Sequence, residues 1–579
     1  MIVSNQKQIE FYEWQLAELD LAWAKYHKSK VLDLYAANEL YIGRIWGYDE
    51  KRGILILRFK EGKFPRLRVP LTISYPKATI GTMSNWTFSY SEFREKNVEQ
   101  YSNCNPVYYL ENKINEEYRY VGFKNISVEF IQHIGLDLKD KSHSIVILGA
   151  EDPPRDYLVA LKNFTKNNPN NTILNLASGD INSWSPKSLQ ETDKLTRDVI
   201  KILDASDNTI IQGPPGTGKT HLIAELCEHY LNNNKRICIT ALTHKALMEA
   251  AIKDGLINKC KTKNVYKTNL SADESALIPE LQNHDVSHPI PNGNLLLATY
   301  YSLSKLLKEN SDVFYDLLII EEASQAFLTT IAGFSNLASK VLVVGDFMQL
   351  QPIVLAENKA INIDQNIFTI INGLKTYSIN NVIDSFRLVN TYRLTDRAST
   401  QTGVFYDNLL NSMSTKKGLP VQGKFSELFC PEGGASLVYF EKMDEGKVPK
   451  NAIDNVIKLI KAIRLEHPTI EIAVLSAFKE TVNALTDSML RVNLNLNKVE
   501  VNTVDRIQGM TVDVCIYLIP SYKSKFSYNP NRFNVATSRA KHGTIIMAEN
   551  LVSDNILLPK DVASFLSKTH KKTIEANNE

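Results

Sequence analysis

Short, continuous apolar runs alternate with segments of helical periodicity through the chain after about residue 190. The first set of runs is NTIIQG, RICITAL, NLLLATY, DLLIIEE and KVLVVGD, and the second is EIAVLSAF, EVNTVD, DVCIYLIP and GTIIMAE. Such runs are typical of parallel strands that are buried on both faces and connected by helices. The pattern predicts an α/β fold with two tandem parallel-sheet domains, over 191–360 and 380–560, separated by a linker at 361–379. A polar stretch at 255–293 predicts a small insertion in the first domain.

The first part of the chain has a different pattern. Its apolar residues recur at three- and four-residue spacing, which predicts a long N-terminal helix within 1–37: Tyr12, Leu16, Leu19, Trp23 and Tyr26. Between 38 and 100, short apolar segments alternate with Gly, Asp and Pro turns, which predicts a small β-barrel-like domain. Residues 101–190 give no clear prediction beyond a helix at PRDYLVALKNF, and 561–579 is predicted to be a disordered tail.

Composition narrows the class of protein only slightly. The chain has 579 residues with a net charge of +2, so any basic surface has to be local. The six cysteines form no C-x-x-C pair, which argues against a zinc or iron–sulfur module and favours a reducing compartment. No apolar run approaches the ~20 residues of a membrane span, and MIVSNQKQIEFYEW lacks a signal-peptide core. We therefore expect a cytoplasmic protein that does not bind a membrane.

One local basic surface is predicted in the β-barrel-like segment. If RFK is part of a strand, Arg58 and Lys60 point away from the apolar Leu57 and Phe59. The basic face is either a solvated charged surface or a contact for phosphates, and the sequence leaves both interpretations open. The candidate contacts are Arg58, Lys60, Arg66 and Arg68.

The stretch IIQGPPGTGKTHL, residues 210–222, matches the phosphate-binding pattern G-x-x-x-x-G-K-[ST]. Glycines in such a loop allow backbone N–H groups to surround phosphate at the N-terminus of a helix. Lys219 is then expected to contact the β- and γ-phosphates of ATP, and Thr220 to hold Mg²⁺. The loop alone does not distinguish kinases, GTPases, transporters and helicases. The predicted nucleotide contacts are Gly213, Pro214, Pro215, Gly216, Thr217, Gly218, Lys219 and Thr220.

Further candidates stand near the ends of other predicted strands. Glu321 and Glu322 end the run LLIIEE, where a pair of acids can hold Mg²⁺ and activate water. Gln349 follows the run VVGD and is expected within reach of the γ-phosphate. Arg393 in NTYRLTD and Arg539 in NVATSRAK belong to the second domain. Arginines on a second domain can close over a nucleotide held by the first.

Six motifs resemble, in order, those of superfamily 1B helicases in the branch of the nonsense-mediated-decay helicase and senataxin. They are GPPGTGKT, EEASQ, GDFMQLQP, TYR, VDRIQGMTVD and NVATSRAK. The resemblance covers about residues 190–550. It implies two RecA-like P-loop domains with a stalk and a β-barrel, and movement along single-stranded DNA or RNA, usually 5′ to 3′, driven by ATP with Mg²⁺. No nuclease motif or cysteine-rich regulatory domain is recognisable, so a protein partner is expected to supply any such activity.

The resemblance also assigns roles by position. Thr220 and Glu321 bind the metal, Glu322 is the general base, and Gln349, Arg393 and Arg539 sense the γ-phosphate. Tyr392 stacks on adenine, and Gln508 with Gly509 links the nucleotide to the strand. The positions implied for nucleic acid are Thr243, His244, Thr299, Ser476, Phe478 and Thr503.

Three positions depart from the pattern of the branch. Glu321 stands where an aspartate is usual, and no glutamine stands in DKLTRDVIKIL, where one would read adenine. Thr511 replaces a glutamate that contacts ribose. The last two changes predict loose discrimination among nucleotides. An alternative function, an ATP-gated clamp or remodelling subunit without processive unwinding, remains open.

Overall fold

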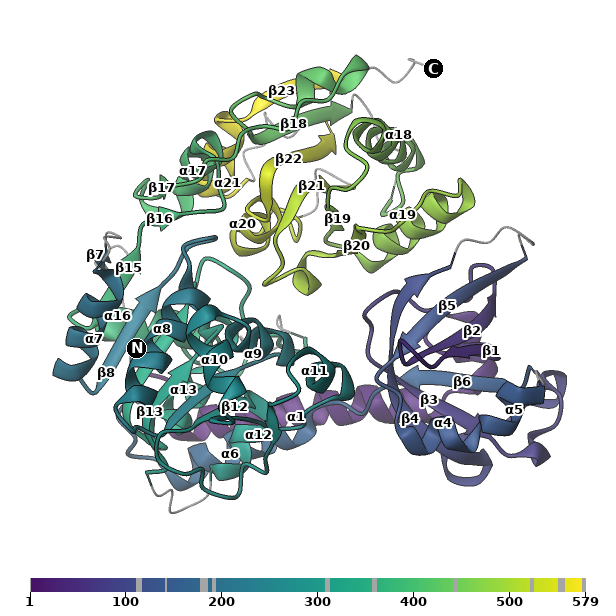
Figure 1. The fold of residues 1–579 in the computed structure, drawn as a ribbon, viewed down its shortest axis with the longest axis horizontal. Coiled ribbons are helices and arrows are strands. Elements are labelled where there is room, and N and C mark those ends of the chain that lie inside the picture. Colours follow the sequence, from purple (N-terminus) through teal and green to yellow (C-terminus); the bar gives the residue numbers. More distant parts are fainter. Residues whose placement is uncertain are drawn as a thin grey trace.

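The computed structural model describes residues 2–110, 117–140, 143–177, 186–189, 194–307, 313–356, 362–440, 446–520, 525–549 and 558–574. Figure 1 shows three bodies, a β-barrel and two α/β lobes, with helix α1 running from the first lobe to the barrel. None of the described helices combines the length and the apolar character that a membrane crossing requires.

The barrel is closed by six strands in the order β1-β2-β5-β4-β3-β6. Alternation along β2 directs Leu57 and Phe59 into its core and leaves Lys60 exposed, as the pattern predicted. The barrel extends to residue 150, well past the predicted boundary at 100, because three of its strands fall in the stretch that gave no clear pattern. The strands are β1 (Tyr41–Asp49), β2 (Ile54–Lys60), β3 (Leu71–Pro76), β4 (Val98–Tyr109), β5 (Tyr118–Lys124) and β6 (Ile145–Ala150), with small helices α2 (Val31–Ala36), α3 (Tyr90–Glu92), α4 (Val128–His133) and α5 (Gly135–Asp140) around them.

Two helices connect the barrel to the first lobe. Helix α1 (Asn5–Lys28) packs along α6 (Arg155–Asn167). Phe11 and Tyr12, near the start of α1, are fully buried and meet the ring of Phe327 in the first lobe edge to face. Near the other end, the Tyr26 hydroxyl accepts a hydrogen bond from the Ala150 N–H of the barrel (3.2 Å). The two helices therefore form a stalk that contacts both bodies.

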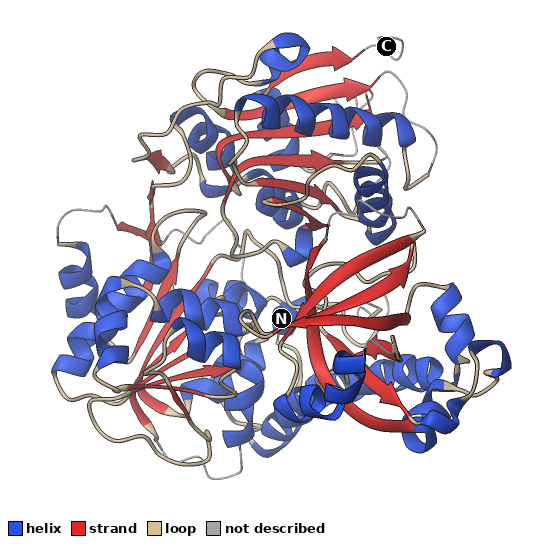
Figure 2. Cartoon of the chain, turned by 45° about the vertical axis from the view of Figure 1, so that its right-hand side comes forward, coloured by secondary structure: helices blue, strands red, loops and turns tan. Residues whose placement is uncertain are grey.

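The first lobe contains a nine-stranded parallel sheet in the order β11-β10-β12-β9-β13-β14-β8-β15-β7. Helices cover both faces of the sheet (Figure 2). The strands are β7 (Lys187–Leu189), β8 (Asn208–Gln212), β9 (Ile237–Ala241), β10 (Val265–Lys267), β11 (Gln282–Asn283), β12 (Leu295–Thr299), β13 (Tyr315–Ile320), β14 (Ala338–Gly345) and β15 (Ser385–Leu388). The helices are α7 (Leu195–Ala205), α8 (Lys219–Asn232), α9 (His244–Ala251), α10 (Asp254–Lys261), α11 (Ala272–Leu277), α12 (Tyr300–Leu303), α13 (Leu328–Ser335), α15 (Phe368–Ile371) and α16 (Gly373–Asn380).

The second lobe contains a six-stranded parallel sheet in the order β20-β19-β21-β22-β18-β23. Its strands are β18 (Gly434–Phe440), β19 (Ile472–Ser476), β20 (Val499–Thr503), β21 (Val512–Leu518), β22 (Ala540–Glu549) and β23 (His570–Ile574). Its helices are α17 (Asp396–Thr402), α18 (Lys450–Glu466), α19 (Lys479–Arg491), α20 (Pro530–Thr537) and α21 (Lys560–Ser567), and β16 (Asn390–Thr391) pairs with β17 (Asn411–Ser412) near the crossing between the lobes. The two tandem α/β domains predicted from the apolar runs are thus confirmed.

Several predicted boundaries are wrong. Strand β15 pairs with β8, so the first lobe continues to residue 388, and α15 and α16 occupy the predicted linker. Strands β10 and β11 extend the edge of the first sheet, although 255–293 was predicted to be an insertion. The predicted disordered tail contains α21 and β23, because β23 finds a parallel partner in β18; residues 575–579 lie outside the described part.

Candidate functional site

The phosphate-binding loop connects β8 to α8, as the motif predicted. Gly216 and Gly218 have φ of 75° and 77°, a left-handed conformation that favours glycine. A Cβ on Gly216 would lie 2.4 Å from Cβ of Arg393, so the loop also needs glycine for space. The loop is anchored to the crossing between the lobes, since the Thr391 hydroxyl donates to the carbonyl of Pro215 (2.8 Å) and the Tyr392 N–H donates to that of Gly216 (2.9 Å).

The two predicted metal ligands lie side by side at the start of α8. The Thr220 hydroxyl donates to Oε1 of Glu321 at 2.9 Å. Glu321 is positioned by β13, and its carbonyl oxygen accepts a hydrogen bond from the hydroxyl of Tyr300 (2.6 Å). The second carboxylate oxygen, Oε2, is buried without a partner among the described residues. Burial and the charge of Glu322 raise the pKa of Glu321 to about 8.

Glu322, the predicted general base, has a strained backbone. Its φ of 54° and ψ of 34° are left-handed, which costs a non-glycine residue ~1 kcal/mol or more and is typical of functional sites. Its Oε1 lies 3.6 Å from where a Cβ on Gly509 would stand, so the carboxylate faces the second lobe. The adjacent Gln508 donates to the hydroxyl of Ser324 (3.5 Å). Burial first and Glu249 second raise the pKa of Glu322 to about 7.

A buried network joins the two lobes beside the loop. Arg539 donates to Oε1 of Gln349 (3.2 Å), and Nε2 of Gln349 donates to Oδ2 of Asp346 (2.9 Å). Asp346 also accepts hydrogen bonds from Gln212 (3.3 Å) and from the hydroxyl of Tyr406 (2.6 Å). Sequence reasoning missed Asp346. Its place directly after β14, the neighbour of β8, was the signal that could have found it.

Three cations converge on this network, of which Arg539 is buried and Lys219 and Arg393 are partly buried. Burial lowers the pKa of Lys219 to about 8, with Arg393 and Arg539 adding to the effect and Asp346 opposing it. Burial and the nearby Arg539 lower the pKa of Arg393 to about 9, and burial lowers that of Arg539 to about 10. Arg393 donates to the carbonyl of Ser538 (3.2 Å), beside Arg539. Cations that repel one another at one point form a site that a polyanion would stabilise.

The residues fit a nucleotide triphosphate with Mg²⁺. The glycine loop opens a helix, Lys219 and the two arginines supply positive charge, and Lys219 donates to carbonyls of the loop itself, Gly213 and Pro214. Buried carboxylate oxygens of Glu321 and Glu322 lack partners among the described residues, and a divalent cation would stabilise their ionised forms. Tyr392, predicted to stack on adenine, is 45% exposed next to the loop.

The predicted nucleic-acid residues follow strand ends in both lobes. Thr243 caps α9 after β9, and Thr299 caps α12 after the adjacent β12. In the second lobe, Ser476 ends β19, where it pairs in register with Thr503 of β20. The side chains of Ser476, Thr299 and Thr503 are buried, so a strand at these points would meet backbone groups. Phe478 caps α19 and lies beside Phe526, with ring centroids 5.9 Å apart.

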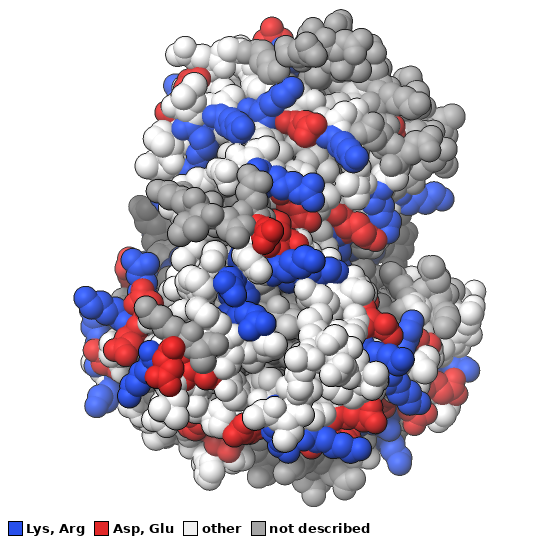
Figure 3. All heavy atoms as spheres, turned by 90° about the vertical axis from the view of Figure 1, so that its right-hand side faces the viewer, with Lys and Arg blue, Asp and Glu red and all other residues white. Residues whose placement is uncertain are grey.

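The four basic residues of the barrel do not form one surface. Arg58 lies between the rings of Trp46 (5.0 Å) and Tyr118 (4.7 Å), and Lys60 is exposed. Arg68 instead reaches the second lobe, where it pairs with Glu500 (3.0 Å). Arg66 is partly buried. Figure 3 shows lysine and arginine side chains interspersed with acidic ones on the face that carries the barrel, without one continuous basic patch.

A cleft of ≈ 1850 Å³ lies where the barrel and both lobes meet. The barrel contributes Arg68 and Arg119, and α9 of the first lobe contributes Lys245. The second lobe contributes Arg491 and Met510. The phosphate-binding loop does not line this cleft, but Gly509, which faces Glu322, does, so the cleft reaches the edge of the nucleotide site. Its position beside α9 makes it a candidate path for a nucleic-acid strand.

Comparisons with known proteins agree with the two-lobed architecture. Residues 196–354 and residues 383–551 each match a family model described as an AAA domain. The protein "DNA replication ATP-dependent helicase/nuclease DNA2" of Bos taurus is 24% identical over 389 residues, which are 60% of this chain and 36% of that protein. Its counterpart in Schizosaccharomyces pombe is 26% identical over 402 residues, 61% of this chain and 27% of that protein. The chain thus spans about a third of the length of these relatives, or less.

Among solved structures, arterivirus nonstructural protein 10 (helicase) is 16% identical, with 61% of each chain covered and a TM-score of 0.31. The structure of that protein with DNA gives 16% identity, coverage of 64% of this chain and 65% of that one, and a TM-score of 0.33. The matches do not single out the nonsense-mediated-decay and senataxin branch. The family matches and the loop geometry together make the chain a P-loop NTPase with two tandem AAA domains of the RecA-like type, similar in sequence to DNA2-type helicases.

Proposed function

We propose that the protein is an ATP-dependent translocase and helicase on single-stranded nucleic acid, with 5′ to 3′ polarity. The observation that carries the proposal is the contribution of both lobes to one nucleotide site. Lys219, Glu321 and Glu322 come from the first lobe, while Arg539 and Gly509 come from the second and lie within contact distance of first-lobe side chains. Hydrolysis at such an interface changes the fit between the lobes, which is the basis of movement along a strand.

The residues of the chain have separable tasks in this proposal. The loop and Lys219 hold the phosphates of ATP, and Thr220 with Glu321 holds Mg²⁺, which neutralises phosphate charge when bound. Glu322 orients the attacking water and accepts its proton, for which a buried carboxylate with a raised pKa is suited. Arg393 and Arg539 balance the charge that develops on the transferred group. Gln349 connects Arg539 of the second lobe to Asp346 of the first lobe through hydrogen bonds, so a change at the nucleotide site changes the contact between the lobes.

The resemblance of the chain to DNA2-type relatives supports DNA as a substrate, while stacking and phosphate contacts suit DNA and RNA equally. A steady-state ATPase assay with matched DNA and RNA single strands tests the proposal. We expect stimulation of several-fold by at least one polymer, and no stimulation by either would overturn it. The ATPase-deficient Glu322→Gln variant is the control, since it should bind strands without turnover.

Strand displacement separates the helicase from a clamp. Duplexes with a 5′ single-stranded tail should be unwound in the presence of ATP, and those with a 3′ tail should not. Stimulated ATP hydrolysis without displacement of either duplex would instead favour an ATP-gated clamp. A protein partner that supplies nuclease or regulatory activity belongs to the same proposal, because no nuclease motif is recognisable in this sequence.

A further inference from the structure

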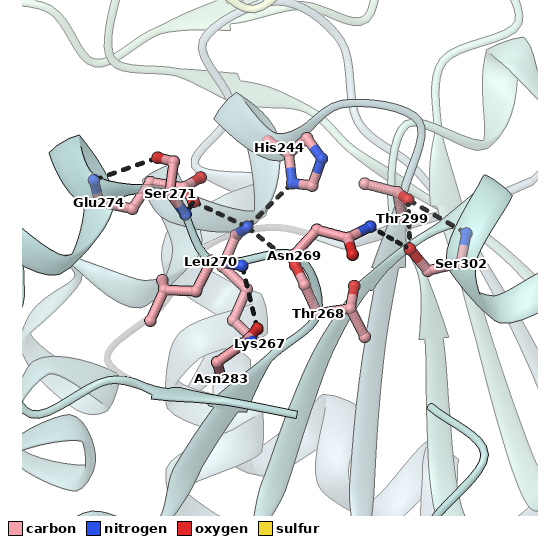
Figure 4. A network of polar contacts seen from close by, with 10 residues as sticks. All are labelled: His244, Lys267, Thr268, Asn269, Leu270, Ser271, Glu274, Asn283, Thr299 and Ser302. Carbon is pink, nitrogen blue, oxygen red and sulfur yellow. Dashed lines mark hydrogen bonds and ion pairs between the residues drawn. The ribbon is translucent and has the colours of Figure 1, made fainter. Parts of the chain in front are cut away.

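A buried lysine lies behind one of the predicted nucleic-acid contacts. Lys267 ends β10, the strand that extends the first sheet, and its side chain is 0% exposed. Figure 4 shows its amino group at the centre of a network that joins β10, α11 and the start of α9. Nζ donates to Oε2 of Glu274 (2.9 Å), to Nδ1 of His244 (2.9 Å) and to the carbonyl of Thr268 (3.2 Å). The nucleotide site does not use this group.

The hydrogen-bond count fixes the protonation of the network. An ammonium group has three donors and no acceptor, and Lys267 faces three acceptors. Each donor of a charged Lys267 is therefore satisfied, and its charge is paired with Glu274. Because Nδ1 of His244 accepts a hydrogen bond from the ammonium group of Lys267, this nitrogen cannot carry its own hydrogen. His244 is then neutral and has its hydrogen on Nε2.

The hydrogen on Nε2 of His244 points away from Lys267. Figure 4 shows the second ring nitrogen of His244 on the far side of the ring from Lys267. The His244 residue is exposed and begins α9, directly after the capping Thr243 and before Lys245, which lines the cleft between the three bodies. Nε2–H thus belongs to the residue that begins α9, where the Thr243 hydroxyl caps the N–H of Ala246, and donors at a helix N-terminus suit a phosphate.

The segment that carries Lys267 is itself held on two sides. Glu274 closes a capping box on α11, in which its carboxylate accepts from the N–H of Ser271 (2.9 Å). The next residue back, Asp273, pairs with Lys124 of the barrel (3.0 Å). On the other side, Asn269 donates to the hydroxyl of Ser302 (3.2 Å), which lies beside the predicted contact Thr299. The network therefore ties the edge of the sheet to both predicted contact segments of the first lobe.

We propose that Lys267 is a positioning residue for nucleic-acid binding: it locks His244 as a neutral donor whose Nε2–H contacts a backbone phosphate of a single strand. The inference rests on the proposed function, because it needs a strand at α9. A neutral donor holds a phosphate without titrating, so the contact keeps its strength across the range in which an ordinary histidine gains charge.

The charged groups around the ring support this. Lys267 from β10 and Glu274 from α11 act on His244 in opposite directions. Partial desolvation of the ring, although the residue is exposed overall, and the charge of Lys267 keep the pKa of His244 below the usual value. Strands β9 and β12, which pack against α9, contain no charged side chain. No charged residue of α8 or α10 is among the groups that shift this pKa. Removal of Lys267 therefore leaves the ring facing Glu274 alone, which favours its protonation.

Fluorescence anisotropy with a labelled single strand of about 15 nucleotides tests the proposal. Wild-type affinity should change little between about pH 7.5 and about pH 5.8, a range that spans the ordinary histidine pKa. Lys267→Met should bind about threefold to tenfold more weakly at the higher pH and regain affinity at the lower pH, as His244 becomes charged. The double variant Lys267→Met/His244→Ala should lose that gain. Lys261→Met, which removes an exposed lysine from the same segment, should behave like wild type.

The binding measurements separate the positioning role of Lys267, the phosphate contact of His244 and the proposed function. A Lys267→Met protein that is weaker by the same factor at every pH would show a merely structural role, and one that binds like wild type would also overturn the inference. His244→Ala with unchanged affinity would exclude the phosphate contact. Wild-type protein that binds no strand would overturn the proposed function and the inference together, whereas normal strand-stimulated ATPase without the pH effect overturns the inference alone.

Discussion

Replacement of Arg539 by alanine tests whether the second lobe takes part in hydrolysis. Arg539 is 2% exposed, and its guanidinium donates to Gln349 across the lobe interface (3.2 Å). An arginine that balances developing charge on a phosphoryl group in cis contributes a factor of about 10³ to 10⁵ in rate, or ~4 to 7 kcal/mol. Without the guanidinium, Oε1 of Gln349 stays buried and has lost this hydrogen-bond donor, which lowers the stability of the folded protein by about 1 to 3 kcal/mol. Relief of repulsion with Arg393 and Lys219 offsets part of that cost.

We therefore expect the turnover number of Arg539→Ala to fall by at least about 10³-fold while the folded protein stays stable and binds ADP. The assays are steady-state ATP hydrolysis with saturating single strands, equilibrium binding of a fluorescent ADP analogue, and thermal unfolding. Arg464→Ala is the matched control, because Arg464 donates to the backbone carbonyls of Pro468 and Asn497, as Arg539 does to that of Val535, but lies outside the site. Turnover of Arg539→Ala within about tenfold of wild type would refute the reasoning, as would an equal loss of ADP affinity.

Two further predictions concern the acid pair and the barrel. Glu322→Gln should abolish hydrolysis and retain ATP binding, whereas Glu321→Asp should keep turnover within about tenfold, under ~1.4 kcal/mol, because Mg²⁺ keeps waters that can bridge a shorter side chain. Normal hydrolysis by Glu322→Gln together with an inactive Glu321→Gln would reverse the two roles. Neutralising Arg58 and Lys60 should flatten the salt dependence of strand binding by about 0.7 for each phosphate interaction that the substitution removes, and neutralising Arg68 should not, because Arg68 is paired with Glu500. Equal slopes for all variants would show that the barrel charges are a solvated face.

The sequence predicted the parts of the fold whose strands are buried on both faces. Runs such as LLLAT in β12 and IAVLS in β19 are apolar throughout, because helices cover each face of a parallel sheet. The second half of the barrel was missed because β4 interrupts its apolar residues with polar ones at five of twelve positions and has a proline, Pro106, within the strand. Strands β15 and β23 are short and owe their place to a neighbour far away in the sequence, which a local pattern does not encode.

The candidate site also has parts that a local sequence pattern predicts and parts that depend on tertiary packing. The loop with Lys219 and the pair Glu321 and Glu322 were predictable because each motif is contiguous. The convergence of Arg393 and Arg539 was predicted from their place on a second domain and from the resemblance, and its cause is the packing of one lobe on the other. Lys267 could not be distinguished from the other lysines of a polar segment. Its burial follows from the addition of β10 to the sheet edge, which only the tertiary structure reveals.

The phosphate-binding loop is hydrogen-bonded to Thr391 and Tyr392, which places it at the hinge between the two lobes. The chain crosses between the lobes at these residues, so the pivot for any rotation of one lobe lies against the loop that holds the phosphates. Displacement in a hinged body grows with distance from the hinge. A shift of a fraction of an ångström at the phosphates therefore becomes a much larger sweep at β20, on the opposite edge of the second sheet, where Arg68 couples the barrel to Glu500. The nucleotide therefore acts next to the hinge, whereas the pair of Arg68 and Glu500, between the barrel and the second lobe, lies far from it.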